Sequence, residues 1–262
     1  MNLVLRKPAM IPETEKVLTV KRLAYVFPGA DRPVFEGVDF ALAKGEFVSL
    51  VGGSGVGKST VLRCAAGLLG PTAGTISLQG DRAQHGRRRS IVFQDSRLLP
   101  WRTVEANVAY GLHGLGLSHS EISDRVEDAL KLTLMADYAK RWPSELSGGQ
   151  QQRVGIARAL AVEPSVLLMD EPFSAVDAIT RGKLQDELLN IWERRRMAVL
   201  FVTHDIEEAV LLSDRILVMG GVAAGTQPAR ITHRNPVDLV RPRSRKEPEF
   251  FRAAARIAGQ LQ

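Results

Sequence analysis

The sequence predicts an α/β protein with a parallel β-sheet core and an inserted α-helical subdomain. Two apolar stretches predict the core: Phe47–Val51 runs into a glycine-rich turn and a helix, and Val166–Met169 ends in two acidic residues. Helical periodicity from about residue 95 to 160 predicts the insertion.

Length and composition set broad limits. With 262 residues and 45% hydrophobic content, the chain can form one large domain or a core with a subdomain. It has no apolar run near the roughly 18 residues of a membrane span, and Met1–Lys16 does not resemble a signal peptide. The single cysteine, Cys64, excludes an internal disulfide, suits a reducing compartment and is expected to be a packed residue. A net charge of +6 allows nucleic acid or anionic lipid as partners without selecting either.

The glycine-rich turn carries the strongest chemical signal. It fits the pattern G-x-x-x-x-G-K-[ST], in which glycines let backbone N–H groups surround phosphate at a helix N-terminus. Lys58 can then reach the β- and γ-phosphates, and the Ser59 hydroxyl can hold Mg²⁺. The sequence predicts that a nucleoside triphosphate is bound by Gly52, Gly53, Ser54, Gly55, Val56, Gly57, Lys58, Ser59 and Thr60.

The stretch before this turn predicts two strands and a base-stacking residue. Val17–Leu23 reads as a strand, and Val34–Leu42 alternates apolar and polar residues as a half-buried strand does. An aromatic side chain upstream of a phosphate loop can stack on the adenine ring. We favour Phe27 over Tyr25 for this role, although either could be an ordinary packed residue.

After the phosphate loop come a helix, Ser59–Leu68, and two strands, Thr75–Leu78 and Ser90–Phe93. Gln94 stands at the end of the second strand, where an amide can ligate Mg²⁺ and hold the attacking water. The basic run Arg87–Arg89 before that strand is expected to be a solvated loop.

Leu98, Leu99, Pro100 and Trp101 then form an apolar cluster outside regular structure. The cluster could be the internal core of the insertion or a surface for a partner, and the residues alone favour neither. Thr103 is a suitable N-cap for the first of three helical segments, which cover Val104–Leu112, Ser120–Leu134 and Ala136–Tyr138.

A second glycine-rich helix start ends the insertion. Leu146, Ser147, Gly148, Gly149 and Gln150 precede a helix over Gln151–Ala161, which gives a second potential phosphate site. Because one γ-phosphate is already enclosed by the first site, the second is expected to act on a nucleotide held by another copy in a two-fold pair.

Two further strands end in polar residues. Asp170 can hold Mg²⁺ through water, and Glu171 can polarise a water for attack on the γ-phosphate. A helix over Thr180–Arg196 leads to the strand Ala198–Val202, after which His204 can bind the γ-phosphate and orient Glu171. The helix and strand that follow are Ile206–Leu212 and Arg215–Met219, and the basic run Arg241–Lys246 is expected to be a solvated tail.

Together these segments resemble the ATPase subunit of an ABC transporter over about residues 18–225. In that family they are the Walker A loop, Q-loop, signature, Walker B, D-loop and H-loop, and here they are Gly52–Thr60, Gln94, Leu146–Gln150, Val166–Glu171, Ser174–Asp177 and His204. The resemblance implies a P-loop NTPase (RecA-like) core with an antiparallel β subdomain and an inserted α-helical subdomain. It implies an ABC ATPase domain over 18–225, with an N-terminal extension over 1–17 and a C-terminal extension over 226–262.

The resemblance implies cofactors, partners and location. Two subunits, a homodimer or a paired ATPase, would sandwich two ATP with Mg²⁺, and Ser147 and Gly149 of one subunit would face the ATP of the other. The sequence from Leu98 to Thr103 is most similar to the ATPases of importers for nitrate, sulfonates and taurine. This resemblance implies a peripheral subunit on the cytoplasmic face of the inner membrane. Leu98–Trp101 would dock on an integral-membrane permease, a substrate-binding protein would act indirectly, and nucleic acid is not a partner.

The chain departs from the family at a few positions. Ser174 and Val176 stand where the family usually has Gly and Leu, so the D-loop contact between subunits is open to change. Glu105 lies one position earlier than usual, and Gly182–Trp192 mildly favours nitrate-like anions over sulfonates. The competing classes are an ABC ATPase that remodels DNA or ribosomes, which usually has two cassettes or coiled-coil arms, and an exporter subunit.

Overall fold

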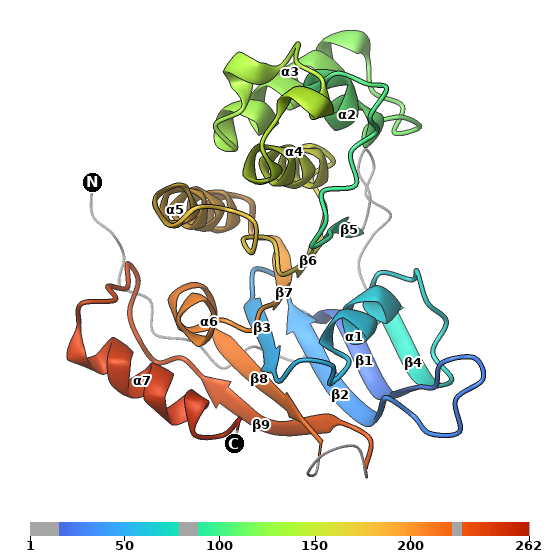
Figure 1. Ribbon diagram of the computed structural model, residues 1–262, viewed down its shortest axis with the longest axis vertical. Helices are drawn as coiled ribbons and strands as arrows, with labels where there is room; N and C mark the ends of the chain where they lie inside the picture. The colour runs from blue at the N-terminus through green and yellow to red at the C-terminus, as the bar shows by residue number, and fades with distance from the viewer. Residues whose placement is uncertain (1–15, 79–88, 222–226, 262) are drawn as a thin grey trace. The chain divides into compact units, whose positions relative to one another are not determined.

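A computed structural model describes residues 16–78, 89–221 and 227–261 (Figure 1). The Arg87–Arg89 run lies largely outside these ranges, as does most of the expected N-terminal extension. The chain divides into two compact units. The first takes the chain up to Gln79 together with Ala198–Gln262, and the second is Gly80–Met197.

The first unit contains a parallel sheet and an antiparallel sheet. Its elements are β1 (Lys16–Tyr25), β2 (Phe35–Ala43), β3 (Phe47–Gly52), α1 (Lys58–Ala65), β4 (Ala73–Leu78), β7 (Ala198–Val202), α6 (Ile206–Leu212), β8 (Arg215–Gly220), β9 (Arg230–Pro236) and α7 (Pro248–Ala258).

Strand β3 is the centre of the parallel sheet. It pairs with β7 on one side and β8 on the other, both parallel, and β9 adds to β8 in the antiparallel direction. Every residue of β3 and β7 is buried, as expected for strands covered on both faces. The second sheet, in the order β2-β1-β4, is antiparallel throughout. The prediction of a parallel core with an antiparallel β subdomain is therefore confirmed within this unit.

The second unit is mainly helical. It contains the parallel pair β5 (Arg89–Val92) and β6 (Val166–Asp170), short 3₁₀ turns at Ala136–Tyr138 and Pro143–Glu145, and the helices α2 (Val104–Tyr110), α3 (His119–Leu132), α4 (Gly148–Ala161) and α5 (Ala178–Arg195).

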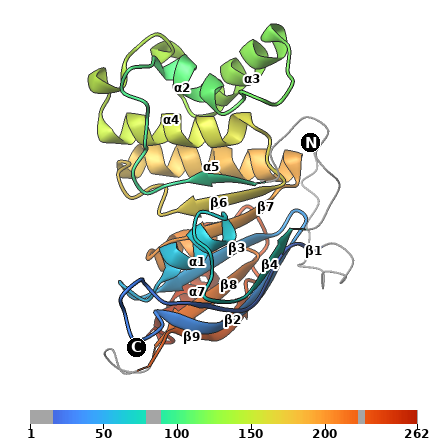
Figure 2. The same cartoon turned by 90° about the vertical axis from the view of Figure 1, so that its right-hand side faces the viewer.

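The helices α2 and α3 pack on α4 (Figure 2). Apolar side chains spaced by three and four residues, such as Val104 and Val108 on α2, meet Val154 and Ala157 on α4 in a buried core. A Ser118–Glu121 capping box starts α3, and the predicted Thr103 cap starts α2.

The structure corrects the view of the C-terminal part of the chain. It forms β9 and α7, and Arg241 and Arg243 are largely covered rather than solvated, so the prediction of a solvated tail is wrong. Strand β9 has a polar sequence without an apolar alternation, so its pattern did not predict a strand. It forms one because its main chain pairs with β8. Helix α7 lies beside α6 (Figure 1) and buries Phe250 and Ile257.

Cys64 is a packed residue of α1, as predicted. Its side chain is buried, and burial raises the pKa of the thiol to about 11. The thiol therefore stays protonated near neutral pH, where it is a poor nucleophile. Among the described residues, no helix is long and apolar enough to cross a membrane.

Candidate functional site

The phosphate loop connects β3 to α1 along a path that needs glycine. Gly57 has a φ of 94°, and a Cβ on it would lie 2.8 Å from Val34 Cγ1. A Cβ on Gly52 would lie 2.3 Å from the carbonyl oxygen of Met219. Larger residues at either position would push the loop away from its supporting strands.

Lys58 places its ammonium group over this loop. The side chain is buried, and Nζ donates hydrogen bonds to the carbonyl oxygens of Gly52 (2.9 Å) and Gly53 (2.8 Å). Ser59 follows in the first turn of α1. The loop thus combines a fixed positive charge, a helix N-terminus and a hydroxyl, which is the chemistry that a triphosphate with Mg²⁺ requires.

The two candidate aromatic residues differ in exposure. Tyr25 is only 8% exposed and stacks on Phe35, whereas Phe27 is 48% exposed. Their rings meet edge to face with centroids 5.1 Å apart. The ring of Phe27 is therefore the more accessible of the two, which favours Phe27 as the stacking residue.

His204 lies between β7 and α6, at the same sheet edge as the phosphate loop. Leu50 of β3 is opposite Val202 of β7 in a parallel pair, so both strands deliver their following residues to that edge. The residues around His204 are fixed: Asp205 caps α6 by accepting from Glu208 N–H (3.1 Å), and its own N–H donates to the Thr203 hydroxyl (3.0 Å). The His204 side chain itself is exposed.

In the second unit, Gln94 and the acidic pair follow adjacent strands. Val92 of β5 is opposite Met169 of β6 in a parallel pair, so Gln94 and Asp170 emerge at one edge. Asp170 is buried, and Gln94 is exposed. Amide and carboxylate oxygens are the hard donors that Mg²⁺ prefers.

Glu171 has an unusual backbone conformation. Its φ of 45° lies in the left-handed region that non-glycine residues rarely adopt, and such strain concentrates at functional positions. The conformation is held by Ser174, whose N–H and hydroxyl both donate to the Glu171 carbonyl (3.2 and 3.0 Å). A glycine at position 174 would lack the hydroxyl bond, so this departure from the family pattern adds support to Glu171. Further along the D-loop, Asp177 caps α5, and the Thr180 N–H lowers the pKa of that carboxyl.

The second glycine-rich motif starts α4 three residues earlier than predicted. Ser147 is the N-cap and forms a capping box with Gln150: the Ser147 hydroxyl accepts from Gln150 N–H, and Gln150 Oε1 accepts from Ser147 N–H. Gly148 and Gly149 thus lie in the first turn of a helix, which is an electropositive position.

Two residues that the motifs did not single out join α4 to the segment around Gln94. Buried Gln152 donates to the carbonyl of Phe93 (2.8 Å), the residue before Gln94. Arg158 donates to the carbonyls of Ser96 (2.8 Å) and Arg97 (2.9 Å), and burial lowers the pKa of its guanidinium. Helix α4, which begins at the signature motif and is called the signature helix below, is therefore hydrogen-bonded to the segment around Gln94.

The apolar cluster at Leu98–Trp101 divides between core and surface. Leu98 packs against the helical core, while the Trp101 side chain is 69% exposed. Buried Asn107 fixes the turn between them. Its Oδ1 accepts from Leu99 N–H (2.7 Å), and its Nδ2 lies 3.0 to 3.1 Å from the carbonyls of Leu99, Arg102 and Thr103. The structure therefore presents Trp101 on a braced loop.

Comparisons with known proteins identify the family. The family model for the ABC transporter matches residues 35–174. The aliphatic sulfonates import ATP-binding protein SsuB 1 of Xanthomonas axonopodis pv. citri (strain 306) is 49% identical over 231 residues, covering 87% of this chain and 88% of that protein. Its counterpart SsuB in Bacillus subtilis (strain 168) is 38% identical over 246 residues, covering 94% and 93%.

The chain belongs to the ABC transporter family, as an ATP-binding subunit.

Solved ABC cassettes share its fold. A dimeric cassette bound to ADP and Pi in a post-hydrolysis state gives a TM-score of 0.72 at 29% identity, covering 84% of this chain and 98% of that one. A cassette from Clostridium perfringens, part of an ABC transporter complex, gives 0.71 at 28% identity, covering 85% and 89%. The predictions of a P-loop NTPase fold and of an ATPase that binds ATP are confirmed.

The structure distributes the predicted site residues of this ABC cassette over its two units. The phosphate loop, Phe27 and His204 belong to the first unit. Gln94, Leu146–Gln150 and the Asp170–Glu171 pair belong to the second. Of the supporting residues that were missed, Gln152 stands directly after the signature, so the run of glutamines was the available signal. Asn107 had no sequence signal beyond its polar character on an apolar helix face.

Proposed function

We propose that this ABC cassette hydrolyses ATP in a nucleotide-sandwich pair to drive uptake of a small sulfonate-type anion through a separate membrane permease. The observation that carries the proposal is the 49% identity to an aliphatic sulfonates import ATP-binding protein over nearly the whole of both chains. The relatives' names favour sulfonates over the nitrate-like anions suggested by Gly182–Trp192. By the same likeness the subunit acts at the cytoplasmic face of the inner membrane.

Residues of the phosphate loop bind the nucleotide in this proposal. Gly52–Gly57 surround the phosphates with backbone N–H groups, Lys58 neutralises β- and γ-phosphate charge, and Phe27 stacks on adenine. The supporting observation is the loop itself, with Lys58 Nζ held over its carbonyls and glycines where side chains would clash.

The oxygen donors of Ser59, Gln94 and Asp170 suit Mg²⁺, which supplies charge neutralisation between the phosphates when bound. Glu171 accepts the proton of the attacking water, and its fixed backbone aims the carboxylate. His204 donates a hydrogen bond to the γ-phosphate and orients Glu171. The amide of Gln94 holds the water in line.

The second glycine-rich helix start would act on the nucleotide that the paired subunit holds. Ser147, Gly148, Gly149 and Gln150 of one subunit contact the γ-phosphate of the nucleotide held by the other, using the N-terminus of α4. The dimeric state of the similar cassette bound to ADP and Pi supports this pairing. The pair is two copies of this chain or this chain with a second ATPase.

The permease contact is assigned to Leu98, Leu99, Pro100 and Trp101. An exposed tryptophan on a loop braced by Asn107 suits a stable protein contact. Because the loop follows Gln94 and is tied to α4 through Arg158, movement of the permease would reach both the Mg²⁺ ligand and the signature helix.

Reconstitution tests the proposal. The cassette, the permease that co-purifies with it and its substrate-binding protein are placed in proteoliposomes, and ATPase is measured with an alkanesulfonate, taurine or nitrate at equal concentration. We expect several-fold stimulation by the sulfonates, no stimulation by nitrate, and none in Glu171→Gln. Stimulation by nitrate alone would overturn the substrate class. A cassette that binds no integral-membrane protein would overturn the importer assignment.

A further inference from the structure

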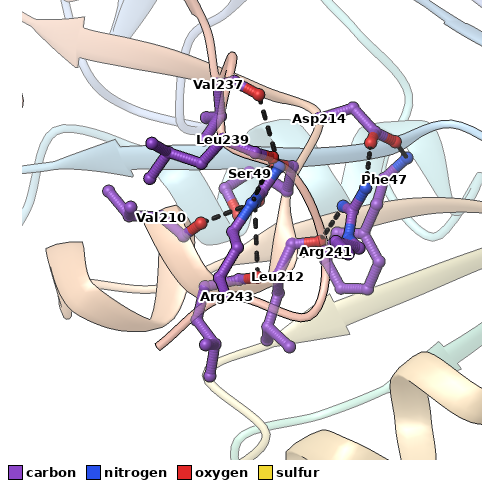
Figure 3. Close-up of polar contacts among 11 residues, drawn as sticks. Phe47, Ser49, Val210, Leu212, Asp214, Val237, Leu239, Arg241 and Arg243 are labelled. Carbon is purple, nitrogen blue, oxygen red and sulfur yellow. Dashed lines mark hydrogen bonds and ion pairs between the residues drawn. The ribbon is translucent and has the colours of Figure 1, made fainter. Parts of the chain in front are cut away.

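The chain after β9 forms a strap, Val237–Arg245, whose Arg241 and Arg243 bond the end of α6 and the residues that follow it (Figure 3). The strap begins at buried Val237, whose N–H donates to the Asp214 carbonyl (2.9 Å). Near its end, Arg245 pairs with Glu207 in the first turn of α6 (3.5 Å). The strap therefore contacts the residue pair that follows α6 at its start and the first turn of α6 near its end.

Arg243 collects the carbonyls at the end of α6. Its Nη1 donates to the carbonyls of Val210 and Ser213 (2.6 Å each), and also lies 3.3 Å from the Leu211 carbonyl. The last carbonyls of a helix have no acceptor role within the helix, so a guanidinium satisfies groups that would otherwise need water. The Nε of Arg243 also bonds Leu239 of the strap (3.0 Å), which fixes the side chain between the two segments.

The hydrogen bonds to these carbonyls explain how the Arg243 guanidinium can be buried. Burial and the neighbouring Arg241 lower the pKa of Arg243 to about 9, so the group remains charged at neutral pH. A buried charge is costly unless several hydrogen bonds compensate it. The planar guanidinium can serve carbonyls in several directions at once, whereas an ammonium has a compact set of donors.

Arg241 extends the same attachment to β3. It forms an ion pair with Asp214 and donates to the Leu212 carbonyl (2.6 Å). The other carboxylate oxygen of Asp214 accepts from Phe47 N–H (2.9 Å), and Asp214 N–H donates to the Phe47 carbonyl (2.8 Å). The side chains of Ser49 and Ser213 add a buried hydroxyl pair between the same segments.

Both anchored elements lead to site residues at their opposite ends. Strand β3 begins at Phe47 and delivers the phosphate loop at Gly52, and α6, only about 10 Å long at helical rise, starts directly after His204 and Asp205. Because its internal hydrogen bonds make so short a helix move as one rigid segment, a shift at its last turn is carried to its first turn.

We propose that Arg243, assisted by Arg241, is a positioning residue that holds α6, and with it His204, in register with the strand that carries the phosphate loop. The inference rests on the proposed role of His204 in hydrolysis. In this proposal the strap contributes to ATP hydrolysis by positioning His204, in addition to any effect on stability.

The test compares three full-length variants. Arg243→Met keeps the length of the side chain and removes its donors, Arg243→Lys keeps the charge and loses the fork, and Arg252→Met removes an arginine that is 75% exposed on α7. Each is measured for kcat and KM of ATPase, for ATP affinity, for Tm, and for the His204 ring signal by NMR, assigned with His204→Gln.

At temperatures well below Tm, we expect Arg243→Met to lower kcat about tenfold or more, since small displacements of a catalytic group are costly. ATP affinity should stay within about twofold, because the phosphate loop is intact, and the His204 signal should shift. Arg243→Lys should show a smaller effect of the same kind, and Arg252→Met none. If Arg243→Met does not fold, the same pattern in Arg243→Lys decides.

A folded Arg243 variant with lower Tm but unchanged kcat and His204 signal would show a merely stabilising strap and overturn the inference. The two proposals fail separately. Should His204→Gln keep full ATPase, the role of His204 falls, while the His204 signal still reports whether the strap positions it.

Discussion

At the scale of single residues, this cassette uses a small number of charged groups whose positions are set by the backbone. Lys58 is the clearest case, because two loop carbonyls hold its ammonium over the phosphate loop. Glu171 is the second, held in a left-handed conformation by Ser174. In both, the main chain aims the side chain, so less ordering is needed at the moment of binding or reaction.

The Lys58→Ala variant should lose ATP binding while keeping its fold. Hydrogen bonds to charged groups contribute about 1.5–3 kcal/mol each, so the loss of Lys58 from two phosphates should weaken binding by at least about a hundredfold. Isothermal titration with MgATP measures the affinity, and a melting curve checks the fold. Lys44→Ala, at an exposed turn before β3, is the control and should bind normally. Unchanged affinity in Lys58→Ala would refute the phosphate-loop assignment.

At the scale of elements, the second unit joins a surface loop to the signature helix through main-chain carbonyls. Asn107 braces the turn that carries Trp101, and Gln152 and Arg158 tie the segment from Phe93 to Arg97 onto α4. Each of these hydrogen bonds has a preferred direction, so together they restrain the loop and the segment after β5 against α4. A push on Trp101 would therefore displace several functional segments together.

The Trp101→Ala variant should uncouple transport without unfolding the subunit. Trp101 is mostly exposed, so its removal should not bring the roughly 3–5 kcal/mol loss that follows truncation of a buried aromatic. Tm and basal ATPase should stay near normal, and uptake by cells carrying the variant should fail. Phe251→Ala removes an exposed aromatic side chain on α7 and should leave uptake intact. A collapsed Tm would favour a core role for Trp101, and normal uptake would remove it from coupling.

The sequence predicts those parts of the molecule whose signals are local. A pattern of about ten consecutive residues or fewer is enough to predict the phosphate loop, the buried strands that lead to Asp170 and His204, and the Thr103 cap. The strap could not be predicted in this way, because Arg243 meets carbonyls 30 to 33 residues earlier that no side-chain pattern marks. The same applies to Asn107 and Gln152, whose importance depends on which main-chain groups the fold brings to them.

At the scale of the whole molecule, one chain carries both a phosphate loop and a second electropositive helix start. A single nucleotide has one γ-phosphate, so the economical use of both is a head-to-tail pair in which each copy completes the other's site. In the proposed pair, dimer formation would depend on bound ATP and dissociation on hydrolysis. The supporting analogy is the dimeric cassette of similar fold.

The Glu171→Gln variant should trap that pair. Losing a positioned base typically slows reaction by about 10²–10⁴-fold, while Gln leaves the binding groups in place, so the ATP-bound dimer should persist. Size-exclusion chromatography with MgATP detects it. Adding Ser147→Arg to Glu171→Gln should restore the monomer, and Asp186→Asn, at an exposed position of α5, should behave as wild type. A monomeric, fully active Glu171→Gln would contradict both the catalytic role and the pair.

The burial of Cys64 has a practical consequence. It is the one cysteine of the sequence, and its side chain on α1 is buried, with a thiol that is protonated at neutral pH. A cysteine introduced at an exposed position, such as Trp142 or Phe251, would therefore be the fast-reacting thiol of the folded chain. Spin labels or fluorophores can be attached there without first replacing Cys64, so the opening and closing of the pair can be followed in a protein that differs from the natural one at a single residue.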